Sequence, residues 1–448
     1  MKLPESFIKR IHTDLGTEAG SFLASLETES PVSIRVNPAK NFNPEGLDRV
    51  VWCENGFYLP ERPLFTLDPL LHAGAYYVQE ASSMFLEQAL KQSVDVNQPL
   101  KVLDLCAAPG GKSTHLASLL SEESLLVSNE VIRPRAKILA ENLTKWGNPN
   151  VIVTNNDPTD FQRLPGFFDV VVVDAPCSGE GLFRKDHSAA DEWSEENVNL
   201  CAARQKRIVA DVWDALKPGG ILIYSTCTYN RHEDEENLQW MVQEMGAEAL
   251  ELDISAFRDI APAQELPGYH FYPHKTRGEG FFIAVLKKDV GQEYRSGKPK
   301  KPALAKVSTT IQKEVSLWVE NPVRFDYWAF QEQVLAFPAR WSGELLALID
   351  KLSIVQAGTE VCEIKAKNLI PSHALAVSSI LKKAAFSIEE LDLKTALTYL
   401  KKEEIKPVGT DQYLLAAYRQ TPLGFLKRAG NRYNNLYPKE WRIRMDIK

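Results

Sequence analysis

The chain has 448 residues, a formal net charge of −7, 44% hydrophobic residues and 25% charged residues. This length suggests about two to four domains, and the composition is ordinary for a soluble globular protein. No run of about 18 apolar residues occurs, so no membrane span is expected. The N-terminal sequence MKLPESFIKRIH lacks the apolar core of a signal peptide, and we therefore expect a cytoplasmic protein.

The six cysteines are dispersed and form no C-x-x-C pair. Zinc sites usually show close ligand pairs of that kind, so the spacing predicts no metal site. Disulfides are rare in long chains without a secretion signal, and free thiols are the expectation. The six positions are Cys53, Cys106, Cys177, Cys201, Cys227 and Cys362.

Charge is distributed unevenly along the chain. Residues 419–448 hold eight basic and two acidic residues, a local balance of +6. The rest of the chain therefore carries −13, the difference between −7 and +6. A basic end on an acidic body is typical of an appended module that binds a polyanion.

The first part of the chain, residues 1–95, has the pattern of a small mixed α/β region that binds RNA. Between about 96 and 290, apolar strand-like runs alternate with helical ones. One helix is expected to end at Gly147, and a longer one to continue to Pro218. This alternation predicts a parallel, doubly wound sheet. The strand-like runs are KVLDLCA, SLLVSNE, VIVTNND, FDVVVVDAPCS, ILIYSTCT and GFFIAVLKK.

The remainder of the chain divides by composition. Residues 291–306, GQEYRSGKPKKPALAK, are polar and basic and contain proline, which is typical of a linker. Residues 307–386 form an intermediate region. Residues 387–448 begin with a helical run and continue in short strand-like runs, and they predict a small RNA-binding domain.

The loop after the first regular strand, CAAPGGKST at 106–114, is the first ligand-binding candidate, because ligands of parallel sheets bind at strand ends. A dinucleotide fingerprint is absent. A phosphate-binding loop would need glycine where Cys106 stands, so ATP or GTP is not expected.

Carboxylates follow three neighbouring strands: Glu130, Asp157 and Asp174. Glu130 is placed to bind both ribose hydroxyls, and Asp157 lies near the expected adenine. Acidic strand ends suit a neutral adenosine carrying a positive sulfonium. Each carboxylate alone is equally well explained as a helix N-cap or a loop turn.

Two further motifs end strands at the same sheet edge, DAPCSGEG at 174–181 and STCT at 225–228. Parallel strands end together, so Cys177 and Cys227 are expected to face one pocket. The residue types alone do not decide which thiol attacks a substrate.

The motifs CAAPGGK, DAPCSGEG and STCT resemble those of the Sun-type RNA cytosine-5 methyltransferase family. The segments 74–83, GAYYVQEASS, and 273–282, PHKTRGEGFF, are similar to its flanking motifs. The C-terminal GNRYNNLYPKEWRI is similar to the PUA-like module of the RsmF branch, which modifies small-subunit ribosomal RNA.

The resemblance implies a Rossmann-like S-adenosylmethionine-dependent core, an N-terminal α/β domain and a C-terminal PUA-like domain. It implies methylation of cytidine C5 in 16S ribosomal RNA, with Cys227 as nucleophile and Cys177 assisting product release. Lys112 would reach the target nucleotide; its alternative is a solvated lysine at a helix start. The cofactor residues would be Cys106, Ala107, Ala108, Pro109, Gly110, Gly111, Lys112, Glu130, Arg135, Asp157 and Asp174.

Cytosine chemistry explains the need for these groups. C5 is a weak nucleophile until a thiolate adds to C6, and a free thiol is only a few per cent ionised at neutral pH. An acid bonded to N3 eases the addition, and Asp174 is placed for that role.

Further contacts, to phosphate or to the flipped base, are expected from Lys185 and its neighbour Arg184; for both, a surface charge pair is the alternative. In the C-terminal tail, arginines alternate with aromatic residues that can stack on bases, although Tyr437 and Trp441 are expected to be partly core. On an early strand, Arg35 and Asn37 face either RNA or the sheet edge. The tail arginines predicted to bind RNA are Arg428, Arg432 and Arg442.

Other substrates and roles stay open at this level. Transfer RNA or large-subunit ribosomal RNA would require the same chemistry, and a uracil-5 methyltransferase is a weaker alternative. A noncatalytic RNA-binding assembly factor is disfavoured because both cysteines and the cofactor loop are intact. We expect a monomer whose partner is 16S ribosomal RNA or the small ribosomal subunit, with no membrane partner.

Overall fold

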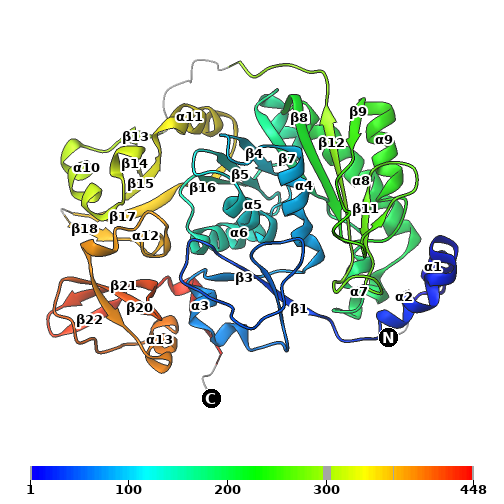
Figure 1. The fold of residues 1–448 in the computed structure, drawn as a ribbon. Coiled ribbons are helices and arrows are strands. Elements are labelled where there is room, and N and C mark those ends of the chain that lie inside the picture. The colour runs from blue at the N-terminus through cyan, green and yellow to red at the C-terminus, as the bar shows by residue number, and fades with distance from the viewer. Residues whose placement is uncertain (1–2, 296–303, 367, 446–448) are drawn as a thin grey trace.

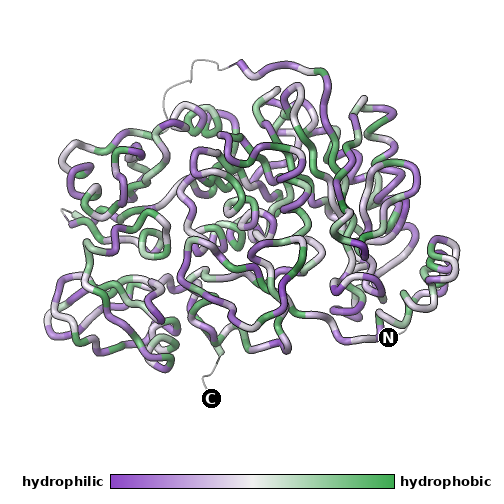
Figure 2. Tube along the Cα trace, in the orientation of Figure 1, coloured by the Kyte–Doolittle hydropathy of each residue, from purple (hydrophilic) through white to green (hydrophobic). Residues whose placement is uncertain are grey.

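The fold is described from a computed structural model covering residues 3–295, 304–366 and 368–445 (Figure 1). Residues 296–303, within the predicted linker, lie outside the described residues. None of the described helices has the length and apolar character needed to cross a membrane. The most apolar stretches of the chain include the strands at the centre of the molecule (Figure 2).

The N-terminal region combines two helices with a small antiparallel sheet of order β2-β1-β3. Phe7 and Phe22 of the helices pack against Phe183 and Tyr229, which lie in loops at the edge of the central sheet. The N-terminal helices therefore form part of the wall around that edge. The bounds are α1 Glu5–Leu15, α2 Ala19–Ser25, β1 Val32–Val36, β2 Gly56–Leu59 and β3 Tyr76–Val78.

The central sheet has ten strands, with β8-β7-β4-β5-β6 parallel as predicted. Val170 and Val172 enter the core on one face, and Val171 and Val173 enter the core on the other. Burial on both faces explains the continuous apolar run of this strand. The bounds are β4 Lys101–Asp104, β5 Leu125–Asn129, β6 Val151–Thr154, β7 Phe168–Asp174, β8 Leu216–Thr226, β9 Ala247–Leu250, β10 Ala261–Pro262, β11 Tyr269–Phe271, β12 Phe281–Lys288 and β16 Ile354–Ala357.

Helices cover both faces of this sheet. The helices α4 (Leu86–Ser93), α5 (Gly111–Leu119) and α6 (Arg133–Trp146) contribute to one core. The other core receives α8 (Glu195–Trp213), α9 (Glu235–Met245) and α11 (Ser342–Lys351).

The two predicted helix ends have different outcomes. As predicted, α6 ends before Gly147, which adopts the left-handed conformation with φ 94°. The prediction that α8 continues to Pro218 is wrong, because it ends at Trp213 and β8 begins at Leu216. Leu216 pairs with Phe168 of β7, so strand pairing outweighs the local helical pattern.

The C-terminal part holds two further sheets, of order β13-β14-β15-β17-β18 and β19-β20-β21-β22. Between β15 and β17 of the first of these sheets, the chain forms β16, which pairs antiparallel with β6 at the edge of the central sheet. The region predicted as an intermediate domain therefore contributes both β16 and α11 to the central layers. The bounds are β13 Ala305–Lys306, α10 Thr309–Val315, β14 Phe325–Phe330, β15 Gln333–Pro338, β17 Thr359–Lys365, β18 Asn368–Pro371, α12 His373–Val377, β19 Ser387–Glu390, α13 Leu393–Leu400, β20 Tyr413–Tyr418, β21 Thr421–Ala429 and β22 Arg432–Asn435.

The N-terminal sheet is joined to the central domain at the end of α6. The Asn37 side-chain amide donates to the Gly74 and Trp146 carbonyls, each at 2.9 Å. Gly74 has φ +69°, and a Cβ there would lie 2.0 Å from the Lys145 carbonyl oxygen. The close approach of the two backbones therefore requires glycine.

Gly74→Ala is expected to lower the free energy of unfolding by about 3 kcal/mol or more, since it adds both a backbone clash and a strained φ. Gly46→Ala is the matched control: Gly46 has φ +75° but open space around its Cβ position, so about 1 kcal/mol is expected. Chemical denaturation of both variants measures the difference, and equal losses would contradict the proposed contact.

Candidate active site

The predicted site residues follow the strands in order along one edge of the central sheet. Cys227 follows β8, Asp174 ends β7, the loop from Cys106 follows β4, and Glu130 follows β5. Asp157 lies three residues beyond the end of β6. The parallel pairing therefore gathers side chains from widely separated sequence positions into one row.

The loop 106–112 turns from β4 into α5. Gly110 has φ +120°, a conformation that favours glycine, and α5 begins at the next residue. Behind the loop, the Ser113 hydroxyl donates to one oxygen of Asp104 at 2.6 Å, while the other oxygen is buried and has no hydrogen-bond partner among the described residues. Burial raises the pKa of Asp104 to about 7. The Ala108 carbonyl accepts from Arg135 at 2.9 Å, which ties α6 to the loop.

Two of the predicted cofactor carboxylates also cap local structure. One oxygen of Glu130 accepts from the Ile132 amide at 2.9 Å, and Arg135 lies 3.5 Å from the other. Asp157 accepts from the backbone and the hydroxyl of Thr159, and so caps a short 3-10 helix. The alternative that Asp157 is a helix N-cap is therefore confirmed. Its contact with the cofactor stays a prediction.

Lys112 and Asp174 form an ion pair of 2.8 Å at the centre of the edge. The other Asp174 oxygen accepts from the Ser225 hydroxyl at 2.9 Å. Burial lowers the pKa of Lys112, but the pairing with Asp174 outweighs it and the net shift is upward. Lys112 is therefore a charged group inside the site, and its alternative as a solvated lysine is wrong.

The two predicted cysteines meet beside this pair, with their Sγ atoms 3.0 Å apart. Both are free thiols and partly exposed. The Cys227 thiol, burial and the Glu233 carboxylate raise the pKa of Cys177 well above its ordinary value. Lys112, in contrast, interacts favourably with Cys227. The two thiols therefore have different electrostatic surroundings.

A buried carboxylate, Glu233, connects the two cysteine loops. It accepts from the Ser178 amide at 3.0 Å, from Gln205 at 2.6 Å and from Asn230 at 2.7 Å. Ser178 follows Cys177, and Asn230 lies three residues after the other cysteine. Sequence reasoning missed this residue, although its place in the acidic run 233–236, shortly after STCT, was a signal that could have been used.

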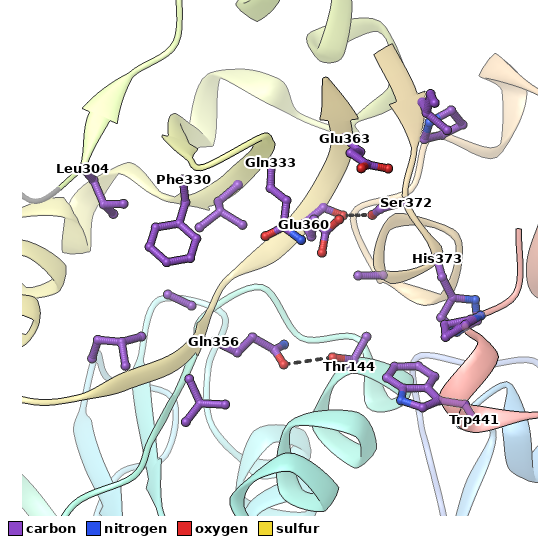
Figure 3. A pocket seen from close by; sticks show the side chains of 18 of the residues that line it. Thr144, Leu304, Phe330, Gln333, Gln356, Glu360, Glu363, Ser372, His373 and Trp441 are labelled. Atoms are coloured by element: carbon purple, nitrogen blue, oxygen red, sulfur yellow. Dashed lines mark hydrogen bonds between the residues drawn. The ribbon is translucent and has the colours of Figure 1, made fainter. Parts of the chain in front are cut away.

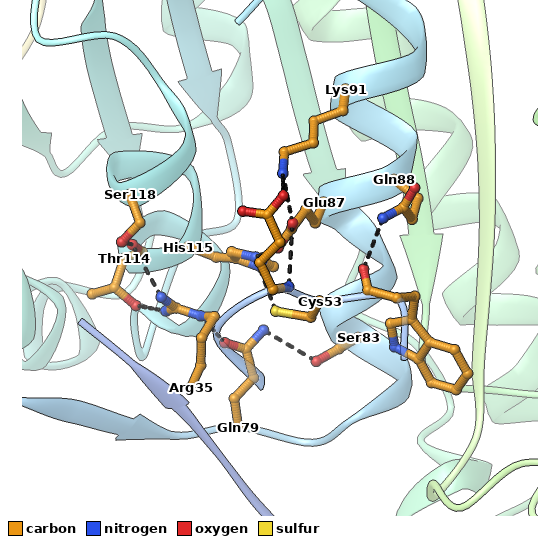
Figure 4. A network of polar contacts seen from close by, with 12 residues as sticks. Arg35, Cys53, Gln79, Ser83, Glu87, Gln88, Lys91, Thr114, His115 and Ser118 are labelled. Carbon is orange, nitrogen blue, oxygen red and sulfur yellow. Dashed lines mark hydrogen bonds and ion pairs between the residues drawn. The ribbon is translucent and has the colours of Figure 1, made fainter. Parts of the chain in front are cut away.

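Arg35 and Asn37 are buried, so the alternative that they face RNA is wrong. The Arg35 guanidinium is 1% exposed and donates to Gln79 at 2.9 Å, to the Thr114 hydroxyl at 2.6 Å and to the Gly111 carbonyl at 3.2 Å (Figure 4). It holds the first turn of α5 and therefore supports the cofactor loop from behind.

The same buried region contains a cysteine, a carboxylate and an imidazole. Cys53, Glu87 and His115 place ligand atoms within 4.8 Å of one another, and His115 lies 3.2 Å from Glu87 (Figure 4). Lys91 pairs with the Glu87 carboxylate at 2.8 Å, so the negative charge of Glu87 is already compensated. The expectation of no zinc site stays a prediction.

The predicted RNA-binding residues occupy different places. Lys185 is exposed, whereas the Arg184 side chain is only 5% exposed and pairs with Glu279 at 2.9 Å, which excludes a surface charge pair at that position. Of these two side chains, Lys185 has the exposure that a phosphate contact would need, and its role in RNA binding stays a prediction.

In the C-terminal sheet, Arg428 and Arg432 are exposed, and Arg428 donates to the Thr410 carbonyl at 2.6 Å. Arg442 is partly exposed. Tyr437 is fully buried and Trp441 partly buried, in line with the expectation that both belong partly to the core.

The fold and the row of groups at its edge define a Rossmann-like methyltransferase. Three family models match the chain: 16S rRNA methyltransferase RsmB/F over residues 92–287, the N-terminal domain of 16S rRNA methyltransferase RsmF over 3–81, and the methyltransferase RsmF PUA domain over 387–443. The chain belongs to the ribosomal RNA small subunit methyltransferase F family.

Individual relatives support this over nearly the full length. The ribosomal RNA small subunit methyltransferase F of Aeromonas hydrophila is 33% identical, with 98% of this chain and 97% of the relative covered. That of Pectobacterium atrosepticum is 32% identical over 94% and 91%. A crystal structure of a methyltransferase homolog from Pyrococcus horikoshii is 30% identical, with a TM-score of 0.55 over 64% of this chain and 95% of its own.

Glu233→Gln is expected to speed alkylation of Cys177 by iodoacetamide several-fold at pH 8. Removing a negative charge lowers the pKa of Cys177, and thus raises its thiolate fraction. Mass spectrometry of the labelled peptides separates the two thiols. Glu236→Gln, on the exposed side of the same turn, is the control. An unchanged Cys177 rate in Glu233→Gln would contradict the electrostatic role.

Proposed function

We propose that this chain transfers a methyl group from S-adenosylmethionine to C5 of cytidine in small-subunit ribosomal RNA, through a covalent bond between Cys227 and C6. The observation that carries the proposal is the pair of thiols 3.0 Å apart, next to the Lys112–Asp174 ion pair. A single methyl transfer to an oxygen or nitrogen would need neither thiol.

The substrate assignment rests on the names of the relatives, which are ribosomal RNA small subunit methyltransferases. The exposed Arg428 and Arg432, on the sheet matched by the PUA model, provide charges for RNA phosphates. These observations favour ribosomal RNA of the small subunit over transfer RNA.

The cofactor assignment rests on how well the row of groups fits the molecule. S-adenosylmethionine supplies an electrophilic methyl group on a positive sulfonium. The glycine turn at Gly110 lets backbone approach a ligand closely, and one oxygen of the buried Asp104 has no partner in the part of the chain that the structure describes. The acidic strand ends at Glu130 and Asp174 suit a cation and would repel a triphosphate.

The proposed reaction uses this chain's residues in a fixed order. The Cys227 thiolate adds to C6, and N3 takes a proton by way of Asp174, so that C5 becomes enamine-like. C5 takes the methyl group, and the electron pair of the broken carbon–sulfur bond stays on sulfur, which leaves as the neutral S-adenosylhomocysteine. A base then removes the C5 proton, the double bond forms again, and Cys227 leaves as a thiolate. Cys177 lies where it can assist this elimination, since its Sγ is 3.0 Å from the departing sulfur.

Cys227→Ala is expected to abolish methyl transfer, a loss of at least about 10⁴-fold, because the covalent route is removed. Transfer of a radioactive methyl group to small-subunit RNA measures it. Cys201→Ala, a buried thiol in α8, is the control and should retain activity. A fully active Cys227→Ala enzyme would sink the assignment.

Cys177→Ala is expected to trap the enzyme on RNA, because elimination slows while addition continues. A denaturing gel should show an enzyme–RNA adduct that is absent from Cys227→Ala and from the double variant. Normal turnover of Cys177→Ala, with no adduct, would show that this thiol has no part in release.

Arg428→Ala and Arg432→Ala are each expected to weaken binding to small-subunit RNA about three- to tenfold and to reduce the salt dependence of binding by about one phosphate contact. Filter binding across a salt series measures both. Lys306→Ala, exposed on β13, is the control. If the salt dependence of binding is the same for all variants, the RNA does not contact Arg428 or Arg432.

A further inference from the structure

A cavity of about 620 Å³ lies beside β16, at the far side of the central sheet from the strand that precedes Cys227. At this place the central sheet, the five-stranded sheet and the C-terminal domain meet. It is bounded by the edge strand β16 and by α11 of the central layers, by β15 and β17 of the five-stranded sheet, and by the end of the C-terminal domain (Figure 3). Its position between domains is where small-ligand and side-chain pockets frequently occur.

The walls of this pocket are mainly apolar, and some of that surface is open. Phe330 is 45% exposed and Val355 is 40% exposed, and both line the pocket. Exposed aromatic and branched side chains at the rim of a cavity are a sign of a binding surface. Trp441 closes the opposite end, beside His373 (Figure 3).

The charged side chains that line the pocket are both acidic. Glu360 and Glu363 line it, and no described lining residue is a lysine or an arginine. Glu363 pairs with Lys365 at 2.9 Å, but among the described residues the Glu360 carboxylate has neither a hydrogen bond nor an ion pair. Burial and the neighbouring Glu363 raise the pKa of Glu360 to about 7. A carboxylate in this setting lacks the cation that would normally accompany it.

A second polar group in the wall also lacks a partner. His373 is 7% exposed, and neither of its ring nitrogens has a hydrogen-bond partner among the described residues. Burial and three nearby lysines lower its pKa to about 3, so its ring is neutral and offers one donor and one acceptor. Buried polar groups are usually satisfied, so the unpartnered His373 ring, at the same cavity as the unpaired carboxylate of the half-buried Glu360, points to a ligand.

We propose that this pocket binds an arginine side chain of a protein partner, with the guanidinium on Glu360 and the methylenes against the apolar wall. A guanidinium is planar and weakly hydrated, donates paired N–H groups to a carboxylate, and stacks on aromatic rings such as Phe330. A compact, strongly hydrated ammonium gains less from apolar walls. RNA is disfavoured, because two carboxylates repel phosphate.

The test compares two peptides on the unmodified full-length chain: Ac-Leu-Arg-Leu-NH2 and the same peptide with citrulline, which keeps the planar shape and loses the charge. Calorimetry at pH 8 is expected to show at least tenfold tighter binding of the arginine peptide. In Glu360→Gln this preference should disappear. Glu332→Gln, exposed at the neighbouring hairpin turn and outside the pocket, should retain it.

Equal affinities for the two peptides, or no binding of either, would overturn the proposal. So would displacement of the arginine peptide by guanosine at comparable concentration, since that result would assign the pocket to an RNA base. Methyl transfer by Glu360→Gln is measured alongside. The peptide preference is independent of activity, so its failure and a failure of the proposed chemistry are distinguishable.

Discussion

The parallel pairing of β7 with β8 is the constraint on which the site depends. Asp174 pairs with Ser225, so the loops that follow the two strands start at the same level of the sheet. Two cysteines fifty positions apart thereby come within 3.0 Å of each other. Glu233 then fixes the distance between the loops, because it bonds the backbone of one and a side chain of the other.

A second constraint comes from outside the central sheet. Arg35 and Asn37 of the N-terminal sheet bond the start of α5 and the end of α6, the two helices that flank the cofactor loop. A buried guanidinium is costly unless its donors are satisfied, and here Gln79 and the helix that carries Lys112 satisfy them. The N-terminal sheet thus supports the chemistry without contacting the reacting groups.

Much of this architecture was predictable from the sequence. Continuous apolar runs located the parallel strands, and strand-end motifs located the row of candidate groups, because both are local patterns. The register that pairs β16 with β6 was not predictable, since it joins segments about two hundred residues apart. For the same reason, the sequence did not decide whether Arg35 contacts RNA or packs inside the protein, because its partners on α5 are distant in the chain.

The residues that matter most beyond the motifs share one property. Glu233 and Glu360 are carboxylates whose surroundings decide their role, the first surrounded by donors and the second without any described partner. A sequence shows that a residue is acidic and does not show what faces it. The helical pattern that continues to Pro218 gave a wrong helix end in the same way, because pairing of Leu216 with β7 determined the structure there.

The central claim is that Cys227 forms a covalent bond with the target cytosine. Small-subunit RNA containing 5-fluorocytidine tests it most directly, because fluorine at C5 blocks the final elimination. After incubation with S-adenosylmethionine and digestion, mass spectrometry should find a methylated nucleotide on the peptide that carries Cys227. A nucleotide on Cys177 instead, or methylated RNA with no adduct on either peptide, would contradict the account.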